Sequence, residues 1–307
     1  MNKIIFTFLI STLLLSKELI TPIPLEVLYD KDKAKLGEKL FNDKRLSKDN
    51  TISCATCHIL EEGGDDNIQV SFGINGQKGT RNSPTVLNSR FNANQFWDGR
   101  AKNLKEQAEG PIHNPIEMGS NFEEVVKKLN KDANYVKAFN KIYKDGITGT
   151  NITNAIAEFE SSLITPNSRF DQFLRGNTKA LNSDEKEGYK LFKEYGCISC
   201  HNGINIGGNL MQRIGVLEEF KTTDFGLYNV TKDQEDKFYF KVPSLRNIQI
   251  TSPYFHDGLT LNLKDAVNKM SYYQVGYTLK EDETDKIILF LKTLTGEQPT
   301  NEKKPNE

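Results

Sequence analysis

The sequence predicts a mainly α-helical protein built from two similar halves, with long loops and little strand. Three observations lead to this prediction. Apolar residues recur at helical spacing in several segments, two separate segments reappear 159 positions further along the chain, and one short cysteine motif occurs once in each half. The length of 307 residues suits two domains.

The cysteine motif is Cys-x-x-Cys-His. Residues 53–60 read SCATCHIL and residues 196–203 read GCISCHNG, and together they hold all four cysteines. Two thiols at this spacing can each bond to one vinyl group of a porphyrin, and the following His can ligate its iron. The motif residues are Cys54, Cys57 and His58 in the first half, and Cys197, Cys200 and His201 in the second.

Two other uses of a Cys-x-x-Cys pair remain open at this point. Four cysteines that meet at one metal ion would form a zinc site, and a single pair could act as a redox dithiol. Both alternatives leave the His of each motif without a function. The motif therefore indicates two covalently bound c-type haems, in a dihaem c-type cytochrome.

The repeated segments predict an internal duplication into two cytochrome c-like haem domains. Residues 84–88 (PTVLN) and 243–247 (PSLRN) lie 159 positions apart, as do residues 98–106 (DGRAKNLKE) and 257–265 (DGLTLNLKD). A further pair, GEKLF and GYKLF, precedes each cysteine motif. The predicted division of the chain is a signal peptide at 1–18, an N-terminal domain at 19–165, a C-terminal domain at 166–298 and a polar tail at 299–307.

The predicted helices follow apolar faces at helical spacing. Such faces indicate helices around residues 36–41, within 122–143 and 152–163, and through 287–294. Helix starts of the capping-box kind are predicted at Asn182 with Glu185 and at Thr278 with Glu281. The helices within 122–143 and 152–163 are expected to join the halves. The loops 59–92 and 203–242 have little periodicity, as expected of chain that wraps around haem edges.

The start of the chain predicts export. Lys3 precedes the apolar run at residues 4–15, which resembles a signal peptide and is short for a membrane span. Cleavage is expected near residues 16–18, and an uncleaved anchor is the alternative. A periplasmic location agrees with covalent haem attachment. The 40 basic and 41 acidic residues give a net charge of −1, so no nucleic-acid partner is expected.

The sixth ligand of each iron decides between electron transfer and chemistry on a small molecule. In the second half, Met270 lies on a predicted helix and is the expected sixth ligand. The same position in the first half is Pro111, within a segment that also carries Gln107, His113, Glu117 and Met118. Glu117 could take a proton from one oxygen of a bound peroxide and deliver it to the other.

Several longer runs together resemble the bacterial dihaem cytochrome c peroxidases, over about residues 20–299. These runs include QKGTRNSPTVLN, FWDGRAKNLKEQAEGPIHNPIEMG, CHNGINIGG, KVPSLRNI, SPYFHDG and LTGEQP. The resemblance implies that the N-terminal haem reduces hydrogen peroxide and that the C-terminal haem receives electrons from a small cytochrome c or cupredoxin. It also implies a homodimer.

The resemblance also implies roles for individual residues. Glu117 and Gln107 match the distal acid–base and amide residues, Trp97 matches a tryptophan between the haems, and Met270 matches the sixth ligand of the second iron. A calcium ion between the domains is implied, held by the Asn82 side chain and by the carbonyl oxygens of Thr251 and Pro253. His256 aligns with Trp97 in the repeat and is expected near the second haem or the interface.

One position departs from the family pattern. Most members carry a loop His that closes the first iron in the fully oxidised state, and the corresponding residue here is Ile74. The first iron is therefore expected to be open, unless His113 or Met118 replaces that ligand. Two rival functions remain: a pure electron-transfer cytochrome, and a dihaem oxidase of a protein substrate that uses Tyr272 or Tyr273 in place of Met270.

Overall fold

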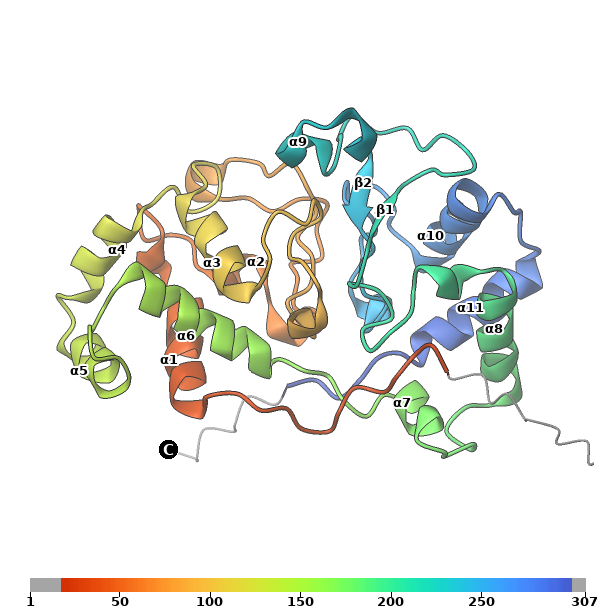
Figure 1. Ribbon diagram of the computed structural model, residues 1–307, viewed down its shortest axis with the longest axis horizontal. Coiled ribbons are helices and arrows are strands. Elements are labelled where there is room, and N and C mark those ends of the chain that lie inside the picture. Colours follow the sequence, from red (N-terminus) through yellow and green to blue (C-terminus); the bar gives the residue numbers. More distant parts are fainter. Residues whose placement is uncertain (1–17, 300–307) are drawn as a thin grey trace, which may run out of the picture.

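The computed structural model describes residues 18–299, and the predicted signal peptide and polar tail lie almost wholly outside this range. Two helical halves lie side by side, with three extended stretches of chain running between them (Figure 1). The N-terminal half contains α1 (Lys31–Phe41), α2 (Cys54–Cys57), α3 (Leu104–His113), α4 (Phe122–Leu129), α5 (Ala133–Ile142) and α6 (Gly149–Ser162). The C-terminal half contains α7 (Arg169–Leu174), α8 (Ser183–Glu194), β1 (Met211–Arg213), α9 (Tyr228–Thr231), β2 (Tyr239–Lys241), α10 (Leu263–Met270) and α11 (Glu281–Lys292).

The core of the N-terminal half forms where α1 crosses α6. A Cβ atom added to Gly37 would lie 1.9 Å from the carbonyl oxygen of Ala155 and 2.9 Å from the Cβ atom of Phe159. The two helix backbones therefore approach so closely that only glycine fits at this position of α1. Around the crossing, Leu40, Phe41 and Ile152 are completely or almost completely buried.

The C-terminal half repeats this crossing with α8 and α11. A Cβ atom added to Gly188 would lie 1.9 Å from the carbonyl oxygen of Lys286 and 3.1 Å from the Cβ atom of Phe290. Gly188 therefore corresponds to Gly37, and Phe290 corresponds to Phe159. This is the packing of the GEKLF and GYKLF segments that recur in the sequence.

Residues 159 positions apart also share backbone conformations. Asn88 and Asn247 have φ angles of 60° and 61°, and Phe96 and Phe255 have φ angles of 65° and 68°. Asn103 and Asn262 cap α3 and α10, each accepting a hydrogen bond from a backbone N–H three residues ahead. The spacing seen in the sequence therefore has a counterpart in the backbone.

The predicted helix boundaries are partly confirmed. Asn182 and Glu185 form the predicted capping box of α8. The prediction for the last helix was wrong, because Lys280 and Glu283 cap α11 in place of Thr278 and Glu281. The predicted helix within 122–143 is divided into α4 and α5, with Asp132 as the cap that starts α5.

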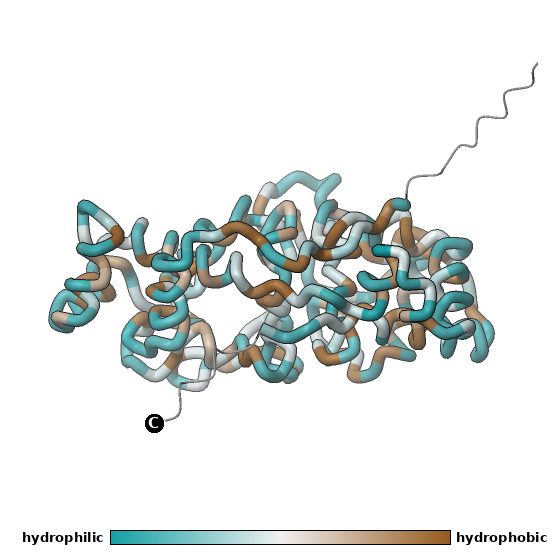
Figure 2. Tube along the Cα trace, turned by 90° about the horizontal axis from the view of Figure 1, so that it is seen from below, coloured by the Kyte–Doolittle hydropathy of each residue, from teal (hydrophilic) through white to brown (hydrophobic). Residues whose placement is uncertain are grey.

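Helix α6 belongs to the N-terminal core. The expectation that this helix joins the two halves was therefore wrong. Extended chain makes that connection: Ile20, from the first described residues, is buried in the core of the C-terminal half, and the chain then runs across to α1. Figure 2 shows hydrophobic stretches on the extended segments between the halves and hydrophilic residues on outer turns. Apolar chain therefore crosses between the two cores.

The described residues are mostly helix and loop. The strands β1 and β2 form one short antiparallel pair, in register from Met211 with Lys241 to Arg213 with Tyr239. Loops 59–92 and 203–242 are largely irregular, as predicted. Within residues 18–299, no helix has the length and apolar character that crossing a membrane requires.

Candidate active site

Each half encloses a cavity lined by its own cysteine motif. The N-terminal cavity has a volume of about 620 Å³ and is lined by Cys54, Cys57 and His58. The C-terminal cavity has a volume of about 360 Å³ and is lined by Cys197, Cys200 and His201. Both volumes lie in the range of cofactor sites.

Both motif histidines are oriented by a backbone carbonyl. The Nδ1 atom of His58 lies 3.1 Å from the carbonyl oxygen of Gly64, and that of His201 lies 3.3 Å from the carbonyl oxygen of Ile206. A proton on Nδ1 would donate to these oxygens and leave the Nε2 lone pair for a metal. Burial lowers the pKa of His58, and it lowers the pKa of His201 to about 4. Both imidazoles are therefore neutral, as an iron ligand must be.

The cysteines fit thioether attachment better than the two alternatives. Burial raises the pKa of Cys57 and of Cys197 to about 11, so neither thiol is ready to ionise as a redox dithiol requires. The two pairs line separate cavities, so they do not meet in a four-cysteine zinc site. Each cavity instead holds two thiols and one neutral His, which fits a covalently attached haem.

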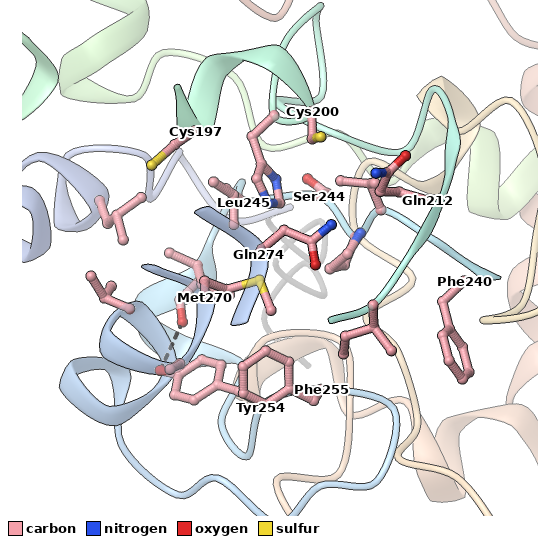
Figure 3. A pocket seen from close by; sticks show the side chains of 18 of the residues that line it. Cys197, Cys200, Gln212, Phe240, Ser244, Leu245, Tyr254, Phe255, Met270 and Gln274 are labelled. Atoms are coloured by element: carbon pink, nitrogen blue, oxygen red, sulfur yellow. Dashed lines mark hydrogen bonds between the residues drawn. The ribbon is translucent and has the colours of Figure 1, made fainter. Parts of the chain in front are cut away.

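In the C-terminal cavity, Met270 ends α10 and lines the wall. Its thioether points into the cavity, whose rim carries Cys197 and Cys200 (Figure 3). Tyr272 and Tyr273 do not line this cavity. The sulfur of Met270 therefore faces the same cavity as the second cysteine motif.

In the N-terminal cavity, Gln107, Pro111, Glu117 and Met118 all line the wall. Proline stands where α10 carries Met270, so no thioether enters from that position. Met118 is 2% exposed and packs into the hydrophobic core. His113 does not line the cavity: it is exposed, and its ring lies against Phe122 at 4.7 Å between centroids.

Glu117 combines burial with two polar neighbours. Burial raises the pKa of Glu117, while a hydrogen bond from the side chain of Asn114 and the charge of Arg100 both act to lower it. The Asn114 amide donates to Oε1 at 2.6 Å. Glu117 is therefore a carboxyl group with a raised pKa that faces the cavity, as an acid–base catalyst requires.

Ile74 is buried behind the Glu117 segment. Its backbone N–H donates to the carbonyl oxygen of Glu117 at 2.8 Å, and its side chain lies beside Gly119. The neighbouring Gly73 lines the cavity and Ile74 does not. The loop at residues 71–79 therefore lies against the segment that carries Glu117, with an aliphatic residue at this position.

Trp97, Asn82 and Lys241 line both cavities. The indole N–H of Trp97 donates to the carbonyl oxygen of Asn82 at 2.9 Å, and the backbone N–H of Lys241 donates to the carbonyl oxygen of Trp97 at 2.7 Å. His256 is buried, and its ring stacks on Phe240 at 4.1 Å between centroids. The Trp97 segment therefore lies between the two cavities, and His256 lines the C-terminal one.

An oxygen-rich corner lies beside Asn82. The Asn82 amide nitrogen donates to the carbonyl oxygens of Ile68 and Gln69, which leaves its Oδ1 free. Asn82, Thr251, Pro253 and the buried Asp65 line the same cavity, and Oδ1 of Asp65 has no hydrogen-bond partner. Burial and then Asp66 raise the pKa of Asp65 to about 7. The corner provides the hard oxygen donors that Ca²⁺ prefers.

Three residues at the cavities were not predicted from the sequence: Arg100, Glu160 and Lys241. The charge of Arg100 lowers the pKa of Glu117, and Lys241 lines both cavities. Glu160 follows Ile156 by four positions on the apolar face of α6 and could have been found as a charge on that face. Arg100 and Lys241 give no such signal, because a loop brings Arg100 to its cavity and Lys241 ends the short strand β2.

Comparison with known proteins agrees with this geometry. Residues 31–179 match the family model for di-haem cytochrome c peroxidase, and residues 185–295 match the model for cytochrome c. The chain is 49% identical to cytochrome c551 peroxidase of Nitrosomonas europaea over 287 residues, which cover 92% of this chain and 86% of that protein. It is 44% identical to cytochrome c551 peroxidase of Pseudomonas aeruginosa over 295 residues, which cover 92% and 85%.

Among solved structures, a MauG-like protein associated with microbial copper homeostasis has a TM-score of 0.80 and 27% sequence identity. The match covers 92% of this chain and 95% of that one. The chain therefore belongs to the di-haem cytochrome c peroxidases, oxidoreductases that act on hydrogen peroxide and carry two covalently bound c-type haems.

Proposed function

We propose that the N-terminal cavity reduces hydrogen peroxide and that the C-terminal haem supplies it with electrons. The overall reaction takes one H₂O₂, two electrons and two protons to two molecules of water. One observation carries the assignment: the larger cavity is lined by Glu117 and Gln107 and has Pro111 where the other cavity has Met270. The N-terminal cavity therefore has side chains that can act on peroxide, whereas in the C-terminal cavity Met270 can occupy the sixth position of the iron.

Glu117 is the proton carrier in this proposal. Its carboxylate accepts the proton of one peroxide oxygen and returns it to the other oxygen, which leaves as water. Asn114 holds Oε1 of Glu117 by a hydrogen bond, so the second oxygen is left to face the peroxide. Gln107 supplies an amide that orients the peroxide. When bound, the haem supplies the electrons that break the O–O bond.

Electrons enter at the C-terminal half and pass to the N-terminal half by way of Trp97. Thioether ligation by Met270 favours ferrous iron, which suits the haem that accepts electrons. The donor is a small cytochrome c or a cupredoxin in the periplasm, which the chain reaches after export through its N-terminal signal segment. The enzyme acts as a homodimer.

The proposal includes a calcium ion between the halves. The Asn82 side chain and the carbonyl oxygens of Thr251 and Pro253 are its ligands, and the unpartnered Oδ1 of Asp65 supports a cation in this corner. Elemental analysis of purified protein, before and after a calcium chelator, tests this. One calcium per chain is expected, and an Asn82→Ala variant should lose it.

The two halves are proposed to descend from one duplicated cytochrome c-like domain, with a boundary near residue 165. The matched crossings at Gly37 and Gly188 support this origin, as do the matched conformations at Asn88 and Asn247. The C-terminal copy kept a closed iron, and the N-terminal copy gained the Glu117 segment.

The function is tested by mixing the haem-loaded protein with a reduced small cytochrome c and following its oxidation. Oxidation should require both hydrogen peroxide and the enzyme, with two donor molecules consumed for each peroxide. A protein that accepts electrons from the donor but does not consume peroxide would be an electron-transfer cytochrome, and the proposal would be rejected.

A further inference from the structure

Glu160 is a buried carboxyl group in the N-terminal cavity that the peroxide chemistry does not use. It lies on α6, is 4% exposed and lines the cavity together with Ile156. Its Oε2 atom is fully buried and has no hydrogen-bond partner. An unpaired buried carboxyl group is costly, so its presence calls for a function.

Within residues 18–299, the buried side chains that pack against α6 are mainly apolar. The elements packed against α6 present apolar faces to it: Leu36, Leu40 and Phe41 from α1, Leu104, Ala108 and Ile112 from α3, and Val125 and Leu129 from α4. The turn at residues 89–91 contributes Ser89, whose hydroxyl also lacks a partner, and Arg90, which donates to the carbonyl oxygens of Ser161 and Leu28. Burial alone raises the pKa of Glu160 to about 8.

The cavity brings Glu160 close to the haem attachment site. Burial raises the pKa of Cys54, and the charge of Glu160 raises it further. Other ionisable groups that line the same cavity are His58, Arg81, Asp98, Arg100, Glu117, Asp224 and Lys241. The pKa of Glu160 is raised by burial, with no contribution from these groups. A haem attached at Cys54 would therefore be the main charged group beside it.

The second half provides an internal comparison. Because Phe159 corresponds to Phe290 at the helix crossings, Glu160 corresponds to Leu291. Ile287 and Leu291 line the C-terminal cavity as Ile156 and Glu160 line the N-terminal one. The same helix face therefore carries a carboxyl group beside the first haem and an aliphatic residue beside the second.

We propose that Glu160 binds a proton when the N-terminal haem is reduced and releases it when that haem is oxidised. The coupled step adds one electron from the donor to the ferric iron and one proton from solvent to the Glu160 carboxylate. No other bond changes. The physical reason is that the net positive charge of a ferric haem favours an ionised neighbouring carboxylate, and this attraction is lost on reduction. At the corresponding helix position beside the C-terminal haem, Leu291 has no ionisable group.

This inference rests on the haem assigned to the N-terminal cavity and does not require peroxide turnover. The midpoint potentials of both haems of the loaded protein are therefore measured by spectroelectrochemistry at a series of pH values around 8. In the wild type, the potential of the N-terminal haem should fall as the pH rises, because reduction then takes up a proton less readily.

Glu160→Gln should remove most of this pH dependence, and Glu160→Leu, which copies Leu291, should do the same. Glu158→Gln is the control on the same helix, because Glu158 accepts a hydrogen bond from the backbone N–H of Asp30 and does not line the cavity. Glu117→Gln should also keep the dependence. Reduced-minus-oxidised infrared spectra should show a protonated carboxyl band that appears on reduction and is missing in Glu160→Gln. A flat wild-type titration, a dependence that survives Glu160→Gln, or its loss in Glu117→Gln would overturn the proposal.

Discussion

The rings of Trp97 and His256 lie edge to face, with their centroids 6.4 Å apart, although the two residues are 159 positions apart in the chain. Each follows a phenylalanine with a positive φ angle, Phe96 in one half and Phe255 in the other. Equivalent residues of the two halves therefore meet at their interface. The two matched segments therefore share one contact, and Trp97 and His256 both line the cavity of the second cysteine motif.

Replacement of Glu117 by Gln should lower peroxide turnover by about 100-fold or more, the usual scale for an acid–base group. The glutamine keeps the shape and the hydrogen bond from Asn114 but cannot carry the proton. Haem content and the absorbance of both haems should be unchanged. Glu109→Gln, on the exposed side of α3, is the control. Turnover near that of the wild type would remove Glu117 from the mechanism.

The acid limb of the pH profile should belong to Glu117. The carboxylate must be ionised to accept a proton, so kcat/KM should fall as the pH drops through its pKa, which burial raises above the ordinary value of 4.5. The charge of Arg100 lowers that pKa. Arg100→Gln should therefore move the acid limb to higher pH, whereas Lys105→Gln on α3 should not. If the acid limb of the kcat/KM profile stays at the same pH in Arg100→Gln, a group other than Glu117 controls it.

Replacement of Met270 by His should lower the potential of one haem and slow its reduction by the donor, because imidazole ligation favours ferric iron more than a thioether does. The other haem should keep its potential. Spectroelectrochemical titration of both haems measures this, with Met211→Leu as the control, since Met211 lies in β1 and does not line the C-terminal cavity. Two unmoved potentials would show that Met270 is only a core residue.

Replacement of Gly37 by Ala should destabilise the protein by at least about 1–3 kcal/mol, the usual cost of forcing a methyl group into a packed core. The new Cβ would meet the backbone carbonyl of Ala155, which cannot move without moving α6. Lys39→Ala, on the exposed face of α1, should have little effect. Denaturant unfolding of the haem-loaded proteins measures the free energy of unfolding of the wild type and of both variants. A Gly37→Ala variant as stable as the wild type would contradict the close crossing of α1 and α6.

The sequence predicts the haem anchors well because covalent attachment requires a fixed local spacing that leaves no freedom in the chain. The helix faces are also local patterns, so the helices α1, α6 and α11 follow from them, and the capping box of Asn182 and Glu185 gives the start of α8. The start of α11 was misplaced by two residues because Thr278 and Glu281 have the pattern of a capping box, whereas the Glu283 side chain accepts from the backbone N–H of Lys280. Lys241 and Arg100 could not be predicted, since long-range packing of the strand β2 and of the loop before α3, not local spacing, brings them to the cavities.

Our main inference is that the N-terminal iron is open and the C-terminal iron is closed. It depends on Ile74, an aliphatic residue that cannot ligate iron, and on Met270. Electron paramagnetic resonance of the fully oxidised, haem-loaded protein tests it most directly. We expect one high-spin and one low-spin ferric haem, with conversion of the first to low spin in Ile74→His. Two low-spin haems in the wild type would contradict it and would point to Met118, which lines the same cavity, as the ligand that closes the first iron.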